Sequence, residues 1–258
     1  MLPTLFISHG SPELAIKEHE VADFLRNLPT IINKKPKRII IVSAHWVSDG
    51  LKILSNDRPG IIYDFYGFPD KLYEKKYPAK NDIEMIDKIK ESLLSKNIKI
   101  SKDYTREGYD HGVWSPLSLM YHDADIPIIQ LSLPAEYNTK QLMQLGSALQ
   151  EFRDDSLIIT SGNLTHDLRG SIWDENVPVA SYAKYFRDTV VEMLEKGDIS
   201  SLIKFISTDQ STRANHPTLE HLFPLFVSIG ASKNKVGKAY NNIYMYSNQA
   251  MDTIVFDS

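Results

Sequence analysis

Short apolar runs rich in β-branched residues recur along the chain and predict the strands of a sheet. They cover residues 4–8, 38–44, 51–54, 126–133, 157–161, 242–247 and 254–256. The runs at 38–44, 126–133 and 157–161 are continuous rather than alternating, which is typical of strands buried on both faces. We therefore expect these three strands at the centre of the sheet.

Segments with helical spacing of apolar residues lie between the runs, over residues 13–28, 81–96, 139–152, 179–194, 199–206 and 218–229. Asn81 and Thr139 are candidate N-caps, and Gly197 breaks the helical stretch that surrounds it. Strands that alternate with helices predict an α/β fold with a central mostly parallel or mixed sheet and helices on both faces. No repeat or long linker divides the chain, so we expect a single domain over residues 1–258.

One irregular region, residues 56–79, is unusually long and contains Ile-Ile-Tyr-Asp-Phe-Tyr-Gly-Phe-Pro. Long loops inside compact domains are often functional. Two interpretations are equally open: a hydrophobic lid over a site, or a loop that packs its own aromatic rings on the core.

The composition narrows the class of protein. The 258 residues are 42% hydrophobic and 24% charged, as in an ordinary globular protein, and the net charge of -4 argues against nucleic acid as a partner. No apolar run approaches the length of a membrane span, and the first residues lack the basic start and cleavage site of a signal peptide. We therefore expect no membrane association and a cytoplasmic location.

The chain contains no cysteine, which excludes disulfides, thiolate metal sites and cysteine nucleophiles. A metal would have to be held by histidine, aspartate or glutamate. Other catalytic motifs are missing too, since no serine lies in a Gly-x-Ser-x-Gly turn and no phosphate-binding glycine loop is present.

Three of the eight histidines follow predicted strands. His9 follows the run 4–8, His45 follows the run 38–44, and His166 lies just beyond the run 157–161. A single histidine at a strand end is usually structural, but the carboxyl edge of an α/β sheet is where ligands bind. Three at equivalent ends therefore predict one crevice, and imidazole is the natural ligand there for a borderline metal.

The other histidines are less clearly placed. His111 lies in a loop before an expected helix. His221 and Glu220 are neighbours at the start of the last long helix, where side chains diverge by about 100°, so only one of the two is expected to face a metal. His19 is expected to be a solvated residue within a helix, His122 a surface residue, and His216 a loop residue, although His216 could also line a pocket.

Six motifs occur in a defined order along nearly the whole chain. They are His-Gly-Ser-Pro at 9–12, Ser-Ala-His-Trp at 43–46, Tyr-Asp-Phe-Tyr-Gly-Phe-Pro at 63–69, Asp-His-Gly-Val-Trp at 110–114, Ser-Gly-Asn-Leu-Thr-His at 161–166 and Pro-Thr-Leu-Glu-His at 217–221. With these motifs the chain resembles the class III extradiol ring-cleavage dioxygenases, the LigB superfamily, and within it the DOPA 4,5-dioxygenase-like branch.

The resemblance implies roles for particular residues. His9 and His45 match two metal ligands, and His221 matches the third ligand of this branch, whereas other branches use a glutamate that Glu220 could supply. His166 matches the acid/base histidine, which could also approach the metal.

His111 matches a second pocket histidine near the substrate. Aromatic residues are expected to wall the substrate ring, because pockets are mostly apolar with few polar groups. These candidates are Tyr63, Phe65, Tyr66, Phe68 and Trp114.

The expected reaction is extradiol cleavage of a catechol-type ring, DOPA-like or related, by O2 with Fe(II) as the catalytic metal. Zn(II) could occupy the site in purified protein, because affinity does not follow biological use. The family is often dimeric, so a homodimer is possible. Two rival functions stay open: a zinc-dependent hydrolase, since three histidines and a water also make a catalytic zinc site, and a non-enzymatic metal-binding protein on the same scaffold.

Overall fold

Four parallel strands form the centre of one large mixed sheet. The computed structural model describes residues 1–174 and 176–256, so Glu175, Asp257 and Ser258 of the expected domain lie outside the described residues. Within that part the sheet has eight strands, in the order β5 (Ile100–Asp103), β3 (Leu51–Leu54), β7 (Ile128–Pro134), β2 (Arg38–Ser48), β8 (Ser156–Gly162), β1 (Thr4–Ser8), β12 (Thr253–Phe256) and β9 (Gly237–Tyr240).

The directions of the strands agree with the expected mixed sheet. Strands β7, β2, β8 and β1 are parallel, whereas β3 runs antiparallel to β7 and β12 antiparallel to β1. Two small ribbons lie outside this sheet, β4 (Gly60–Ile61) with β6 (Gly108–Tyr109) and β10 (Tyr244–Met245) with β11 (Gln249–Ala250). The three continuous apolar runs are β2, β7 and β8, next to one another at the centre of the sheet, as predicted.

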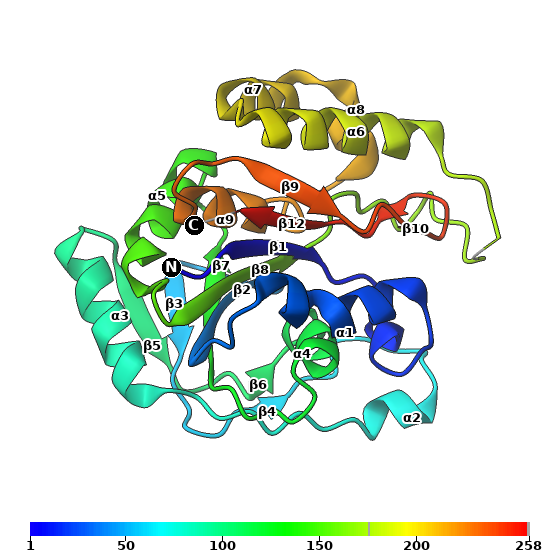
Figure 1. The fold of residues 1–258 in the computed structure, drawn as a ribbon. Coiled ribbons are helices and arrows are strands. Elements are labelled where there is room, and N and C mark those ends of the chain that lie inside the picture. Colours follow the sequence, from blue (N-terminus) through cyan, green and yellow to red (C-terminus); the bar gives the residue numbers. More distant parts are fainter. Residues whose placement is uncertain (175, 257–258) are drawn as a thin grey trace.

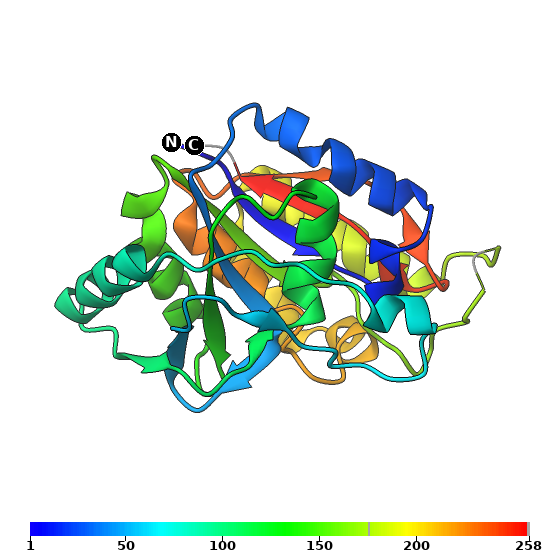
Figure 2. The same ribbon diagram turned by 90° about the horizontal axis from the view of Figure 1, so that it is seen from below.

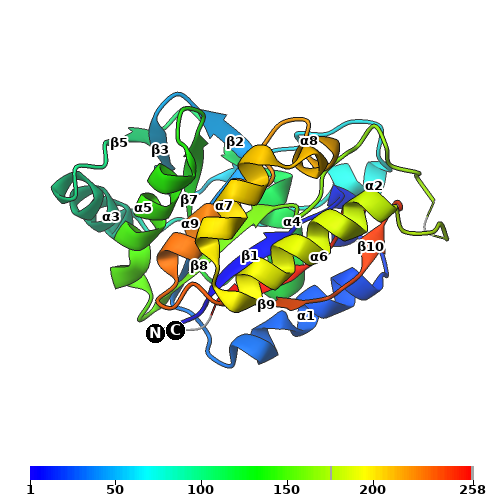
Figure 3. The same cartoon turned by 90° about the horizontal axis from the view of Figure 1, so that it is seen from above.

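Helices cover both faces of the sheet (Figures 1–3). They are η1 (Pro12–Ala15), α1 (Glu20–Ile32), α2 (Asp70–Tyr73), α3 (Ile83–Ser95), α4 (His111–Met120), α5 (Thr139–Leu149), η2 (Gln150–Phe152), α6 (Ser181–Lys196), α7 (Ile199–Thr208), α8 (Gln210–Asn215) and α9 (Pro224–Ala231), where η marks a 3₁₀ helix. Figure 2 looks onto the face covered by α1 and α4, and Figure 3 onto the face covered by α5, α9, α7 and α6.

Alternate residues of the central strands supply two hydrophobic cores, one on each face. On β1, Phe6 packs in the core beneath α5, α6 and α9, whereas Leu5 and Ile7 pack in the core beneath α1 and α4. Ile40 and Ile39 of β2 divide in the same way. Each strand is therefore buried on both sides, which explains why its sequence is continuously apolar.

Several predicted helix ends were wrong because hydrogen bonding by polar side chains decides the boundary. The expected helix 13–28 is divided into η1 and α1, and His19 caps α1 by accepting a hydrogen bond from the backbone N–H of Val21, so it does not lie within a helix. Asp82, not Asn81, caps α3, since the Asn81 amide donates instead to the carbonyl of Leu54. Asn138, not Thr139, caps α5.

Two further segments, near residue 220 and near residue 245, also differ from the prediction. Helix α9 begins at Pro224, six residues later than expected, because proline suits the first helical turn and the preceding residues form tight turns. Within the expected strand 242–247, only Tyr244 and Met245 pair with another strand. Tyr246 and Ser247 have positive φ and form the turn of the β10–β11 hairpin instead.

Candidate active site

The carboxyl ends of β2, β8 and β1 lie side by side, and each strand contains or precedes a histidine near that end. His9 is the residue after β1, and His166 lies four residues beyond the end of β8 at Gly162. Strand β2 does not end at Ala44 as predicted but continues through His45 to Ser48. Its pairing with β8 stops at Ser43, and its register with β7 shifts between Val42 and Val47, so His45 lies at an irregular point of the strand.

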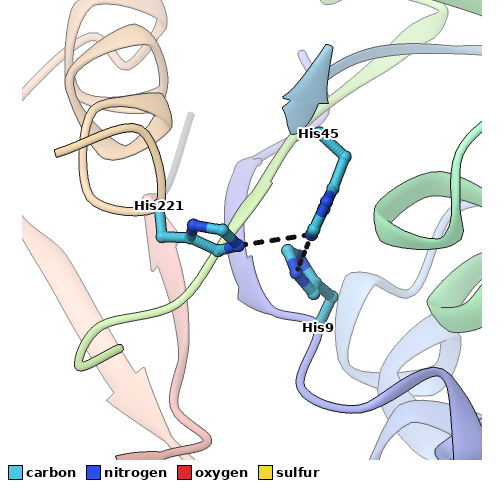
Figure 4. Close-up of side chains that lie close together, drawn as sticks. All are labelled: His9, His45 and His221. Carbon is cyan, nitrogen blue, oxygen red and sulfur yellow. Dashed lines mark hydrogen bonds between the residues drawn. The ribbon is translucent and has the colours of Figure 1, made fainter. Parts of the chain in front are cut away.

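His9, His45 and His221 point toward one another from three separate segments (Figure 4). The Nε2 atom of His45 lies 3.0 Å from Nε2 of His9 and 3.2 Å from Nε2 of His221. Cis ligands of one metal ion at 2.0–2.1 Å would be separated by roughly 3.0–3.4 Å, which matches these distances. His221 comes from the turns that precede α9, far from the strands in the sequence.

The other ring nitrogen of each histidine faces an oxygen. Nδ1 of His9 lies 2.8 Å from Ser161 Oγ, and because the Ser161 hydroxyl donates to the carbonyl of Gly112, it accepts from His9. Nδ1 of His221 lies 3.0 Å from Glu220 Oε1, and Nδ1 of His45 lies 3.3 Å from a carboxylate oxygen of Asp64. These oxygens favour a hydrogen on all three Nδ1 atoms.

Hydrogens on the three Nδ1 atoms leave lone pairs on the three Nε2 atoms, which face one another at short distance. Such lone pairs repel unless a cation lies between them. The donor set of three neutral imidazoles, each oriented by an oxygen, is typical of sites for divalent transition metals. The residues present therefore fit a bound divalent ion.

Burial and mutual repulsion keep these histidines neutral. Burial lowers the pKa of His45 and the pKa of His166 to about 4, and it holds the pKa of His9 and of His221 well below 6.5. The hydrogen bond from His221 lowers the pKa of Glu220 to about 2. At neutral pH the imidazoles are therefore in the form that binds metals or accepts protons.

Asp64, from the aromatic-rich loop at residues 56–79, contacts two of the histidines. Its carboxylate accepts a hydrogen bond from the backbone N–H of His111, and one oxygen lies 3.0 Å from Nδ1 of His111 while the other faces His45. Burial acts to raise the pKa of Asp64, but the contacts with His111 and His45 hold it at about 2. Asp64 is therefore an anion that orients both rings, a function that was not predicted for it.

Asp110 is a buried hydrogen-bonding hub behind the site. It precedes α4, which His111 begins, so His111 lies in a helix and not in a loop. The Asp110 carboxylate accepts hydrogen bonds from Ser43, Arg106 and Gln130 at 2.6, 2.8 and 2.6 Å. Ser43 in turn accepts from the backbone N–H of His45, so this hub connects β2 with the start of α4.

Gly162 allows the backbones of the site to approach closely. Its carbonyl accepts from the backbone N–H of His9, and a Cβ at position 162 would lie only 2.0 Å from the carbonyl oxygen of His221. Any larger residue would displace one of these two histidines.

A cleft of about 310 Å³ opens above the histidines. It is lined by His9, Gly10, Ser11, Pro12, His45, Asp64, Phe65, Phe68, His111, His166, Leu168, Trp173, His221 and Gln249. All five candidate histidines are therefore brought together. Glu220 does not line the cleft and lies behind His221.

The predicted aromatic residues divide into three groups. Phe65 and Phe68 line the cleft, with ring centroids 5.3 Å apart. Trp114 is fully buried and lies behind Phe65. Its ring centroid is 6.1 Å from that of Phe65 and 6.4 Å from that of Tyr63. Tyr66 is 93% exposed and lies outside the lining. The loop at residues 56–79 therefore contributes Phe65 and Phe68 to the lining of the cleft, and both rings also pack against the core, as the second interpretation expected.

Another part of the lining was not predicted from the sequence. Leu168, Trp173 and Gln249 come from the segment after β8 and from strand β11. The backbone N–H of Ile172 donates to the carbonyl of Tyr246, which attaches this segment to the β10–β11 hairpin. No local periodicity marks such residues, because a contact between distant segments places them.

The remaining histidines lie outside the cleft lining. His122 is exposed, as expected. His216 is buried at the end of α8, and its Nε2 lies 2.9 Å from the carbonyl of Leu164, to which it donates. That contact supports the loop role that we favoured for His216.

An α/β sheet whose carboxyl edge carries a cleft of converging imidazoles is the arrangement of an enzyme site. The family model described as the catalytic LigB subunit of aromatic ring-opening dioxygenase matches residues 3–255. The chain therefore belongs to the LigB family and is an extradiol aromatic ring-opening dioxygenase.

Named relatives support this assignment. The chain is 37% identical to a 4,5-DOPA dioxygenase extradiol of Beta vulgaris over 232 residues, which cover 89% of this chain and 86% of that protein. It is 32% identical to a 4,5-DOPA dioxygenase extradiol of Escherichia coli K12, with 89% and 85% covered. An uncharacterized Escherichia coli K12 protein of known crystal structure has the same fold, with a TM-score of 0.79, 24% identity and full coverage of both chains.

Of the helices in the described part of the chain, none is both long and apolar enough to cross a bilayer.

Proposed function

We propose that this enzyme cleaves a catechol-type ring with O2, using one Fe(II) ion bound by His9, His45 and His221. The observation that carries the proposal is the approach of the three Nε2 atoms at 3.0 and 3.2 Å, with an oxygen beside each Nδ1. A divalent iron held there would supply Lewis acidity and electron transfer between the catechol and O2. DOPA and simpler catechols are candidate substrates, since the relatives named above are DOPA dioxygenases.

We assign the third ligand to His221 rather than Glu220. The Nε2 atom of His221 faces His45, whereas Glu220 Oε1 faces Nδ1 on the far side of the His221 ring. A carboxylate in that position orients the histidine and increases its basicity.

His166 is the proposed acid/base residue. It lines the cleft beside the three ligands, and burial keeps it neutral at pH 7, so it can accept a proton from a catechol hydroxyl and return it later. General acid/base catalysis of this kind contributes about 10²- to 10⁴-fold. His111, which lies beside His45 and contacts Asp64, is proposed to hydrogen-bond to the reactants.

The apolar walls would hold the substrate ring and exclude water. Phe65 and Phe68 form one wall of the cleft, and Leu168 and Trp173 come from the other segment. Buried Trp114 would support Phe65 from behind rather than contact the ring.

Oxygen consumption with defined metals tests the proposal. The protein is stripped of metal, loaded anaerobically with Fe(II) or Zn(II), and mixed with a catechol panel that includes DOPA in an oxygen-electrode cell. We expect equimolar uptake of O2 and a yellow ring-opened product with Fe(II), and neither with Zn(II), which has no redox chemistry.

Metal analysis of the same samples gives the control. One metal per chain in both samples, with turnover only in the iron form, would support the proposal. Ester or amide hydrolysis by the zinc form without O2 uptake would favour the hydrolase, and an inactive protein with one Fe(II) bound would contradict the function.

A further inference from the structure

A second hollow, of about 440 Å³, is bordered by the two ends of the aromatic-rich loop at residues 56–79. It lies beside the β4–β6 ribbon, at the bottom of Figure 1, and shares no lining residue with the histidine cleft. Four of its lining residues are cations, namely Arg58, Lys75, Lys76 and Lys80. Among the described residues of the lining there is no aspartate or glutamate, so the hollow has a strong positive charge.

Backbone hydrogen bonds hold the two cationic segments together. The backbone N–H of Asn81 donates to the carbonyl of Asp57 at 3.0 Å, which joins the residue after Lys80 to the residue before Arg58. The Lys80 carbonyl in turn accepts from the backbone N–H of Ile128 in β7. The fold therefore fixes like charges around one hollow, and their repulsion costs free energy that a bound anion would remove.

The surroundings of Lys75 show the same imbalance. Lys75 is half-buried, and its pKa is lowered by burial and by the positive charges of Lys71 and Arg26. Arg58 has an acidic neighbour, since its Nε lies 3.7 Å from a carboxylate oxygen of Asp57, but both side chains are largely exposed and such a pair contributes little. The cations of the hollow are therefore poorly neutralised by the protein itself.

Buried and half-buried apolar residues lie between the cations. Tyr77 is buried, and its hydroxyl oxygen lies 3.1 and 3.0 Å from the carbonyls of Leu117 and Tyr121, at the end of α4. Pro59 is also buried, and half-buried Ile61 is held in the β4–β6 ribbon. An apolar surface fixed beneath several cations suits an organic group that carries a strong anion.

We propose that this hollow binds a small organic phosphate, with the phosphate among the four cations and the organic part against Tyr77 and Ile61. Lysine and arginine side chains are the usual partners of phosphate oxygens in proteins. The ligand would also contact Tyr63, whose hydroxyl donates to the Lys75 carbonyl and whose ring centroid lies 6.1 Å from that of Phe65 in the cleft lining. This site is additional to the ring-cleavage site and does not depend on the function proposed for it.

Calorimetric titration of the iron-loaded enzyme with phenyl phosphate, in the absence of oxygen, tests the site. This probe joins a phosphate to an apolar ring. We expect one molecule to bind per chain, and inorganic phosphate to bind more weakly because it cannot contact the apolar residues. Absence of phenyl phosphate binding would overturn the proposal, and equal Kd values for the two probes would overturn the organic class of the ligand.

Removal of positive charge tests which residues bind the phosphate. The double variant Lys75→Gln/Lys80→Gln removes two of the four charges, and Lys88→Gln, at an exposed position of α3, is the matched control. We expect the Kd for phenyl phosphate to rise by about tenfold or more in the double variant and to stay unchanged in the control. Equal Kd values in all three proteins would place the phosphate elsewhere, for example on the iron, and would contradict the site.

Catechol turnover of the double variant serves as the control for folding. Neither lysine lines the cleft, so turnover should equal that of the wild type.

Hydrogen exchange locates the ligand without any substitution. We expect phenyl phosphate to slow amide exchange in residues 58–63 and 75–80 and to leave residues 9–12 and 168–173 of the cleft unchanged. Slower exchange in the cleft segments alone would show that the probe binds beside the histidines, and would overturn the proposal even if both lysine substitutions disturbed the fold.

Discussion

His166 stacks on His221, with 3.5 Å between the ring centroids and 10° between the ring planes. The backbone N–H of His166 also donates to the carbonyl of Asn215. The hydrogen bond fixes the backbone of His166, and the stacking with His221 orients its ring. The acid/base candidate therefore stacks on His221, one of the three residues proposed to bind the metal through Nε2.

This arrangement predicts that His166→Ala separates metal binding from turnover. We expect one iron per chain to remain and kcat to fall by about 10²- to 10⁴-fold, because proton transfer is lost while the three ligands stay. Metal analysis and oxygen uptake measure the two effects, and exposed His122→Ala is the matched control. If His166→Ala loses its metal, His166 is a ligand and the assignment fails.

Variants of Glu220 and His221 can distinguish the residue that binds the metal from the residue that orients it. Glu220→Ala leaves Nδ1 of His221 without its carboxylate, and loss of such a partner typically weakens metal affinity by about 10- to 100-fold. Competition with a chelator measures the affinity, and saturating metal should restore most of the turnover.

Two further variants complete this comparison. His221→Ala should lose far more affinity than Glu220→Ala, and Thr218→Ala, which removes only a hydroxyl that donates to Glu220, should lose little. Weaker binding in Glu220→Ala than in His221→Ala would make the carboxylate the ligand.

How much of the site could be predicted depends on which contacts place each residue. The apolar pattern of the strands predicted His9, His45 and His166 at the carboxyl edge of the sheet, because neighbouring parallel strands end at the same edge. His221 lies more than fifty residues beyond the last of them, in turns without a strand pattern, and only the resemblance assigned it to the site. Its position depends on hydrogen bonding between Asn163 N–H and the His221 carbonyl, which no local sequence reveals.

The same reason explains the errors in the fold. Asn81 and Asp82 are both good capping residues, and the Leu54 carbonyl, from a distant strand, engages Asn81 and leaves Asp82 to cap the helix. Trp173 and Gln249 were missed because a loop and a hairpin position them together. Periodicity reports burial, whereas these residues are placed by specific hydrogen bonds.

Asp110→Asn is expected to destabilise the protein. Asp110 is fully buried and pairs with Arg106, and breaking a buried ion pair on one side costs about 3 kcal/mol. Urea unfolding of the metal-free protein measures this loss of unfolding free energy. Asp23→Asn, which breaks the exposed pair with Arg26, is the matched control and should change it by less than about 1 kcal/mol.

The Asp110 variant should also bind metal less tightly, since Ser43 connects this carboxylate to the backbone of His45. An unfolding free energy equal to that of the Asp23 control would show that the hub contributes nothing to stability.

His216 predicts how stability depends on pH. It is buried, its Nε2 donates to the Leu164 carbonyl, and burial lowers its pKa to about 4. The unfolded chain, with a pKa near 6.5, therefore binds more protons than the folded chain between pH 6.5 and 4. Unfolding free energy should fall as pH drops through this window and should not respond to this group above it.

The proposed ligands have lowered pKa values as well, so the contribution of His216 must be isolated by a variant. In metal-free protein, His216→Gln can keep the hydrogen bond to Leu164 but cannot titrate. The loss of unfolding free energy between pH 6.5 and 4.5 should be smaller in the variant than in the wild type, by up to about 3 kcal/mol. Urea unfolding at a series of pH values measures both slopes. Because the comparison is between slopes, a general loss of stability in the variant does not affect it, and parallel slopes would show that His216 titrates normally in the folded protein.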